Sequence, residues 1–146
     1  MKTNRPKLAA LTTFLVLIAL SCERPVCGCV SPPAPVNGVW ALTSITYGLT
    51  QKRVTASEAG YTETISYDGL VEAGTFKRLR NGNEVETGNF SLSFPNGGNT
   101  KGIVLYLNDK TWQSFEIRSD NVLYLSERSP HGTDIADGAT YAYQKQ

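Results

Sequence analysis

The stretch YTETISYDGLVEAGTFKRLRNGNEVETGNFSLSF, residues 61–94, alternates β-rich segments with two strong turn signals. Asp68-Gly69 and Asn81-Gly82 are typical of tight hairpin turns, because both central residues of the favoured turn need a positive φ. A chain that reverses twice in this way forms an antiparallel meander. The strands expected from it cover residues 61–67, 70–80 and 84–94.

The alternation with a period of two continues on both sides of this meander and sets the fold class. No segment after residue 37 has a sustained 3.6-residue apolar repeat. The remaining strands are expected over residues 39–47, 102–107, 111–117, 122–127 and 139–146, and the longer loops over residues 49–60 and 128–138. Eight strands, each joined to its sequence neighbour, predict an all-β, eight-stranded antiparallel up-and-down barrel.

The N-terminal residues have the anatomy of a secretory signal. A basic start precedes an apolar run over residues 8–20, which ends directly before Ser21-Cys22. A membrane-spanning helix needs about 20 apolar residues, so this run is too short to remain as an anchor. Ala19-Leu20-Ser21-Cys22 resembles the bacterial lipobox, which implies an acylated Cys22 that holds the protein in a membrane. The same small residues also suit ordinary secretory cleavage, so a freely secreted protein is the alternative.

Three segments follow from this interpretation. Residues 1–21 are the signal peptide, and residues 22–37 are a tether that begins at the lipidated Cys22 and contains four prolines. Residues 38–146 form a single barrel domain, whose length suits one hydrophobic core. We expect it in the cell envelope, on the outer membrane of a Gram-negative bacterium, facing the periplasm or the exterior. Cys27 and Cys29 lie in the tether, where a structural or incidental role is expected.

Composition and motifs argue against several classes of function. After removal of the signal, eleven basic residues stand against thirteen acidic ones, whereas a nucleic-acid-binding protein would show a basic patch. We expect no metal or cofactor, because two tether thiols and the single histidine supply too few ligands. The segment 129–134 places a serine, His131 and an aspartate close together, but it is expected to be a surface loop. Enzyme activity is the least favoured interpretation.

Gly38-Val39-Trp40 matches the Gly-x-Trp pattern in the first strand of lipocalins. The succession of strands around this motif resembles the lipocalin-like domains of bacterial lipoproteins over roughly residues 38–145. Residues 65–69, 88–90 and 141–143 also carry this resemblance. The resemblance implies a barrel able to hold a small molecule. The arginine that stacks on the tryptophan in that family has no clear counterpart here, and Lys145 is the nearest cation in the last strand.

The expected site follows from the size of such a barrel. An eight-stranded barrel is just wide enough to be filled by side chains or to hold one small ligand. Trp40 is expected in the core, where it closes one end. The residues expected to line a ligand cavity are Phe76, Phe90, Leu92, Phe94, Tyr106, Trp112, Tyr124 and Tyr141. The leading hypothesis is therefore an anchored protein that binds a small apolar or amphipathic ligand, and the alternative is a packed structural or protein-interaction module of the envelope.

Overall fold

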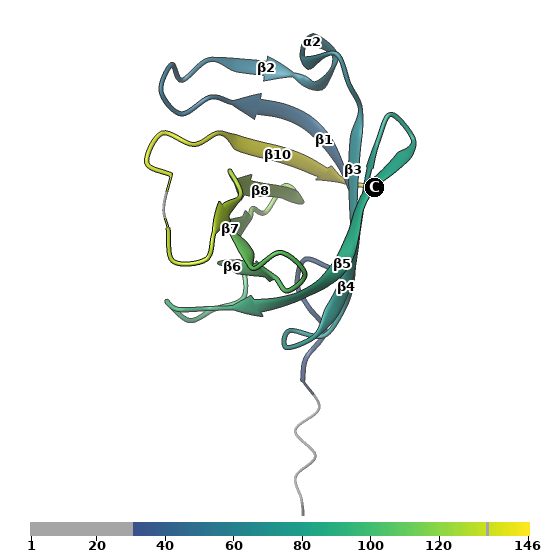
Figure 1. The fold of residues 1–146 in the computed structure, drawn as a ribbon, viewed down its shortest axis with the longest axis vertical. Helices are drawn as coiled ribbons and strands as arrows, with labels where there is room; N and C mark the ends of the chain where they lie inside the picture. Colours follow the sequence, from purple (N-terminus) through teal and green to yellow (C-terminus); the bar gives the residue numbers. More distant parts are fainter. Residues whose placement is uncertain (1–30, 134) are drawn as a thin grey trace, which may run out of the picture. The chain divides into compact units, whose positions relative to one another are not determined.

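The computed structural model describes residues 31–133 and 135–146. Its elements are β1 (Gly38–Thr46), β2 (Arg53–Thr55), α2 (Ala56–Ala59), β3 (Glu63–Gly69), β4 (Gly74–Arg80), β5 (Asn83–Ser93), β6 (Lys101–Tyr106), β7 (Thr111–Ile117), β8 (Val122–Ser126), β9 (Ser129–Pro130) and β10 (Thr140–Lys145). Eight strands pair antiparallel in the order β1-β3-β4-β5-β6-β7-β8-β10, and β10 pairs with β1 to close the sheet (Figure 1). The expected all-β, eight-stranded up-and-down barrel is confirmed, and it is compatible with a lipocalin-like fold.

The two turn signals of the central meander behave differently. Asn81 and Gly82 have φ values of 51° and 78°, and Arg80 pairs with Asn83, so this dipeptide is the expected two-residue turn. Asp68 and Gly69 instead end β3, and the chain reverses over residues 70–73. The predicted turn is therefore misplaced by a few residues, because tertiary contacts determine where the chain reverses.

Those contacts involve Val71 at the tip of the reversal. Its N–H donates to the carbonyl of Pro32, and its own carbonyl accepts the N–H of Leu92, at 3.1 and 2.7 Å. Val71 also packs against the hydrophobic core. A tight Asp-Gly turn would shorten the hairpin and remove these contacts.

Two regions expected as loops contain short elements. Residues 49–60 include β2, which pairs with the end of β1, and the four-residue helix α2. Thr55 and Glu58 form a capping box, in which each side chain accepts the other's backbone N–H. Residues 128–138 include β9, which pairs with the start of β7.

One end of the barrel is closed by the segment before β1. Val36 is fully buried, and its carbonyl accepts the indole N–H of Trp40 at 2.6 Å. The ammonium group of Lys145 lies 5.2 Å from the centroid of the Trp40 ring, so the cation noted in the sequence does cover the tryptophan. The packed unit starts at Ser31, before the expected boundary at Gly38. Cys22, Cys27 and Cys29 lie outside the described residues.

The hydrophobic core lies inside the barrel, where alternate residues of each strand point inward. Tyr67, Phe76, Phe90 and Tyr106 are at most 2 % exposed and form its aromatic centre. Among the described residues, none belongs to a helix long and apolar enough to cross a membrane.

Candidate functional site at the barrel mouth

The side chains expected to line a ligand cavity fall into three groups. Phe76, Phe90 and Tyr106 are in the core, where the ring centroids of Phe76 and Tyr106 are 4.8 Å apart and those of Phe90 and Tyr67 are 5.1 Å apart, both edge to face. The other members of this first group are Leu92, which is buried, and Phe94, which packs at the edge of the core. These residues therefore fill the interior by packing against one another.

Trp112 and Tyr124 form the second group and lie on the outer face of the barrel. Their strand neighbours Gln113 and Leu123 are buried, and successive side chains of a strand point to opposite faces. The structure thus places both aromatic residues outside the barrel rather than in its lining. Tyr141, the third group, is half-buried beside a polar cavity at the end of the barrel away from Trp40.

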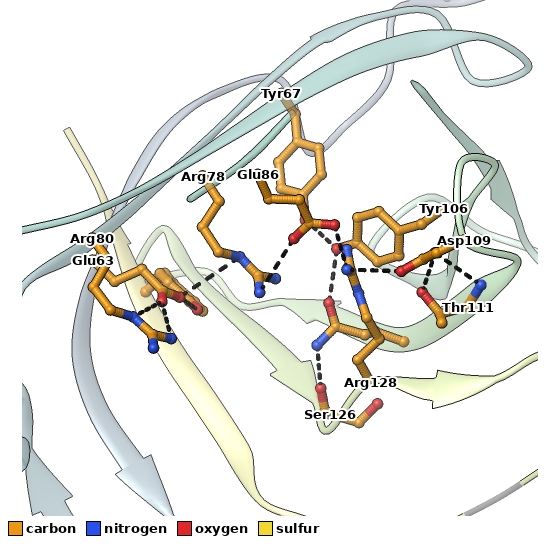
Figure 2. Close-up of polar contacts among 12 residues, drawn as sticks. Glu63, Tyr67, Arg78, Arg80, Glu86, Tyr106, Asp109, Thr111, Ser126 and Arg128 are labelled. Atoms are coloured by element: carbon orange, nitrogen blue, oxygen red, sulfur yellow. Dashed lines mark hydrogen bonds and ion pairs between the residues drawn. The ribbon is translucent and has the colours of Figure 1, made fainter. Parts of the chain in front are cut away.

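This polar end, which we call the barrel mouth, is lined by Glu63, Arg78, Arg80, Gln113, Glu127, Arg128, Tyr141 and Tyr143. Its cavity measures about 210 Å³. Figure 2 shows charged side chains from several strands meeting there. The barrel is therefore apolar at its centre and strongly polar at its mouth.

Glu63 is the most buried charged group of the barrel mouth, at 4 % exposed. Its carboxylate accepts hydrogen bonds from Arg80 Nε and Nη2, at 3.1 and 2.8 Å, and from the Tyr143 hydroxyl at 2.7 Å. A buried carboxylate needs such partners because desolvation alone would make it costly. The hydrogen bond to Glu63 also raises the pKa of Arg80.

Arg78 and Arg128 reach the barrel mouth from opposite sides and share the carboxylate of Glu86. Arg128 Nη1 donates to Glu86 and lies 3.3 Å from Asp109 Oδ2, while Arg78 Nη1 is 3.6 Å from Glu86 Oε2. The Arg128 guanidinium also lies 3.6 Å from the centroid of the Tyr106 ring. Arg128 thus lies at the boundary between the polar cavity and the aromatic core, in contact with Tyr106.

A β-bulge directs Arg128 inward. Phe115 pairs with Leu125 and Trp112 pairs with Ser129, so three residues, 126–128, stand opposite two on β7. An extra residue in one strand bends it and re-aims its side chains, and such bulges are common beside binding sites. Without it, the alternation would not bring Arg128 over the core.

A second irregularity occurs beside Arg78. Arg78 pairs with Glu86 and Leu79 pairs with Glu84, which leaves Val85 as the extra residue of β5. The bulge lies on the turn side of the Arg78–Glu86 pair, which keeps the regular register of β4 and β5. Of the two arginines, only Arg128 therefore owes its direction to a break in strand regularity.

Within the described part of the chain, three buried guanidinium nitrogens have no hydrogen-bond acceptor: Arg78 Nε, Arg128 Nε and Arg128 Nη2. The closest carboxylate oxygen to Arg78 Nε, on Glu63, is 3.9 Å away, which is too long for a hydrogen bond. Buried donors are nearly always satisfied, because an unmet one costs about 1–3 kcal/mol. These nitrogens need acceptors from water or from an anion.

A hydrogen-bonded chain holds the base of the barrel mouth. The Tyr106 hydroxyl donates to Gln113 Oε1 at 2.7 Å and accepts from the Tyr67 hydroxyl at 2.7 Å, and Gln113 Nε2 donates to the carbonyl of Ser126 at 2.6 Å. Burial raises the pKa of Tyr106, and raises that of Tyr67 and Tyr143 well above the usual value, so all three hydroxyls stay protonated at neutral pH.

A second depression of about 380 Å³ adjoins the barrel mouth. Tyr141 and Glu127 line both, and the loop after β1 contributes Tyr47 and Leu49. Tyr47 is 45 % exposed and Leu49 is 78 % exposed. Apolar surface thus lies next to the arginine cavity.

The loop considered for catalysis lies elsewhere. His131 lines an outer depression with Leu105, Leu107 and Lys110. Among the described residues, no acidic side chain lines this depression, so none of them is placed there to pair with the imidazole. Its backbone N–H donates to the carbonyl of Lys110. In the part of the chain that the structure describes, no group of three His, Cys, Asp or Glu side chains is placed to hold a metal ion.

The polar cluster was missed by the sequence analysis, although a signal for it exists. Arg78 shares its strand parity with Phe76, and Glu63 shares its parity with Ile65 and Tyr67. Charged residues on an inward-facing row mark a polar layer inside a barrel. Arg128 carries no such signal, because the bulge that turns it inward interrupts the alternation.

Comparison of the chain with protein-family models and with curated protein sequences finds no match.

Proposed function

We propose that this protein is a lipid-anchored envelope protein whose barrel mouth binds a small amphipathic molecule with an anionic head group. The observation that carries the proposal is the set of buried, unmet guanidinium nitrogens of Arg78 and Arg128 beside a cavity. Guanidinium groups present planar pairs of donors, which match the two oxygens of a carboxylate.

The charges at the barrel mouth favour a monoanionic carboxylate as the head group. Three arginines stand against four acids, Glu63, Glu86, Asp109 and Glu127, so the fixed charges sum to about one negative charge. A doubly charged phosphate would meet stronger repulsion from those acids than a single carboxylate does. The cavity of about 210 Å³ has the volume of about seven water molecules, which suits a head group and a few further atoms.

The rest of the ligand has a place next to the head. The neighbouring depression offers the ring of Tyr141 together with the exposed side chains of Tyr47 and Leu49. Burying these apolar surfaces against a ligand tail would contribute about 25 cal/mol per Å². The filled aromatic core supports a tail that lies at the surface rather than deep in the barrel.

The anchor part of the proposal rests on Cys22 and the apolar run before it. Two acyl chains suffice for stable attachment to a membrane, since each buried CH₂ adds about 0.8 kcal/mol. Such an anchor would keep the barrel close to sources of amphipathic molecules.

The alternative function is a packed envelope module that binds other proteins and no small ligand. The filled core supports it, because Phe76, Phe90 and Tyr106 leave no room at the barrel centre. Under this alternative, water molecules accept the hydrogen bonds of the unpaired guanidinium nitrogens of Arg78 and Arg128.

Isothermal titration calorimetry on the full chain in mild detergent decides between the two. The probes are medium-chain and aryl-substituted carboxylic acids, each with its matched alcohol. We expect the acids to bind and the alcohols to bind at least tenfold more weakly. Arg78→Gln and Arg128→Gln should abolish binding, whereas Arg53→Gln, an exposed arginine on β2, should not change it. Equal binding of acids and alcohols, or none by any probe, would overturn the proposal.

A further inference from the structure

A second candidate site lies on the outer face of the barrel, where β7 and β8 diverge. Beyond the Phe115–Leu125 pair the strands stop exchanging backbone hydrogen bonds, and the Ser114 N–H donates instead to the Ser126 hydroxyl at 2.9 Å. Two depressions of about 550 and 240 Å³ occur there. They share Trp112, Ser114, Ser126 and Thr140, so they form one continuous outer groove.

The outer groove combines an aromatic ring with hydroxyl groups. Trp112 shares this part of the groove with the hydroxyls of Ser114, Ser126 and Thr140, of which that of Ser126 already bonds the Ser114 N–H and the Glu127 carbonyl. Further along, Glu116 bridges Lys101 and Arg118 in two ion pairs, at 3.1 and 3.3 Å, which leaves these three groups with a net charge of only +1.

The indole of Trp112 is fixed in a particular orientation. Its N–H lies 3.1 Å from the carbonyl oxygen of Pro130 and 3.0 Å from that of Thr133, and donates to both. The N–H is therefore already used, and only the flat ring is left for a partner. A surface that offers a ring face and hydroxyls, with no free indole donor, selects partners that stack and carry hydroxyls of their own.

We propose that the outer groove binds a carbohydrate chain. A pyranose has an apolar face of C–H groups, which stacks on an aromatic ring, and a rim of hydroxyls, which exchange hydrogen bonds with serine and threonine. Nucleic acid fits poorly, because a net charge of +1 from Lys101, Glu116 and Arg118 is too small to match a phosphate backbone. A proline-rich peptide fits poorly too, because aromatic grooves hold such peptides by donating to their carbonyls, and Trp112 has no donor to spare.

Titration of the full chain in mild detergent with soluble oligosaccharides tests this site. The probes are linear oligomers of glucose, of N-acetylglucosamine and of the alternating sugars of bacterial cell-wall glycan. Trp40 is 1 % exposed, so a change in tryptophan fluorescence on binding reports Trp112. We expect one oligomer class to shift this fluorescence saturably, with affinity that rises with chain length.

Substitutions make the test specific. Trp112→Ala should weaken binding at least tenfold by calorimetry, and Trp112→Phe, which keeps a ring, should weaken it less. Ser114→Arg, at an exposed position, should block the outer groove without disturbing the core. Val39→Ala, an exposed site on β1, is the control and should bind as the wild type does.

Two results would overturn the carbohydrate site. One is that no oligosaccharide binds at millimolar concentration. The other is that Trp112→Ala and Ser114→Arg bind as tightly as Val39→Ala.

Discussion

At the scale of single residues, Glu63 is the charged group on which the barrel mouth depends most. It is nearly fully buried and accepts from Arg80 and Tyr143. Removing one partner of a buried ion pair is costly because the other charge stays behind, so Glu63→Gln should lower the free energy of unfolding by about 3 kcal/mol. Urea denaturation monitored by circular dichroism measures this change.

Glu84 provides the matched control for that substitution. It pairs with Lys77 at 2.8 Å, but both side chains are about half exposed. Exposed pairs contribute about 0–1 kcal/mol. If Glu84→Gln destabilised the protein as much as Glu63→Gln, burial could not be the reason for the effect.

The buried tyrosines predict a loss of stability in alkali. Burial raises the pKa of Tyr67, Tyr106 and Tyr143, so the folded state holds these protons more tightly than the unfolded state does. Their contribution is complete below the unfolded pKa of about 10 and is lost as the pH rises through the folded values. Of the seven tyrosines, these three should form tyrosinate only as the circular dichroism of the barrel disappears. Reversible titration of all seven in a folded barrel would disprove this.

At the scale of elements, the segment before β1 belongs to the barrel. Val36 is fully buried in the core and Val39 is 45 % exposed to solvent, so the two valines form a matched pair. Val36→Ala should cost about 2 kcal/mol, from two buried carbon groups and the cavity they leave. Val39→Ala should stay within about 0.5 kcal/mol. Equal effects in thermal denaturation would show that this segment does not close the barrel.

The strands were predictable from sequence because alternation and local turn signals determine most of them. Asn81-Gly82 is a true two-residue turn, since both residues adopt the positive φ that the dipeptide favours. Asp68-Gly69 is not, because Val71 makes contacts with residues distant in sequence. The turn is therefore set by packing, which a local pattern does not contain.

The site was less predictable than the strands, for a related reason. The aromatic residues proposed as lining do face inward at Phe76, Phe90 and Tyr106, but whether they enclose a space depends on how rings from separate strands meet. Arg78 could have been found from its parity with Phe76. Arg128 could not, because its direction depends on a bulge.

At the scale of the whole molecule, we propose a membrane anchor at Cys22 that is joined to a barrel with a polar mouth. Acylation of Cys22 should place the protein in the membrane fraction, and Cys22→Ala should release it into the soluble fraction of the envelope. Mass spectrometry of the mature N-terminus checks this, since acyl chains add a distinctive mass. Membrane attachment that persists in Cys22→Ala would show that something other than this cysteine holds the protein.

We propose that the barrel mouth binds a ligand, and native mass spectrometry can detect that ligand without a candidate being chosen beforehand. The full chain is extracted from envelopes in mild detergent, which is removed in the gas phase. We expect one stoichiometric adduct with the mass of a small carboxylic acid, lost on denaturation and absent from the variant carrying both Arg78→Gln and Arg128→Gln. A wild-type protein with no adduct, or an adduct that survives both substitutions, would contradict ligand binding at the barrel mouth.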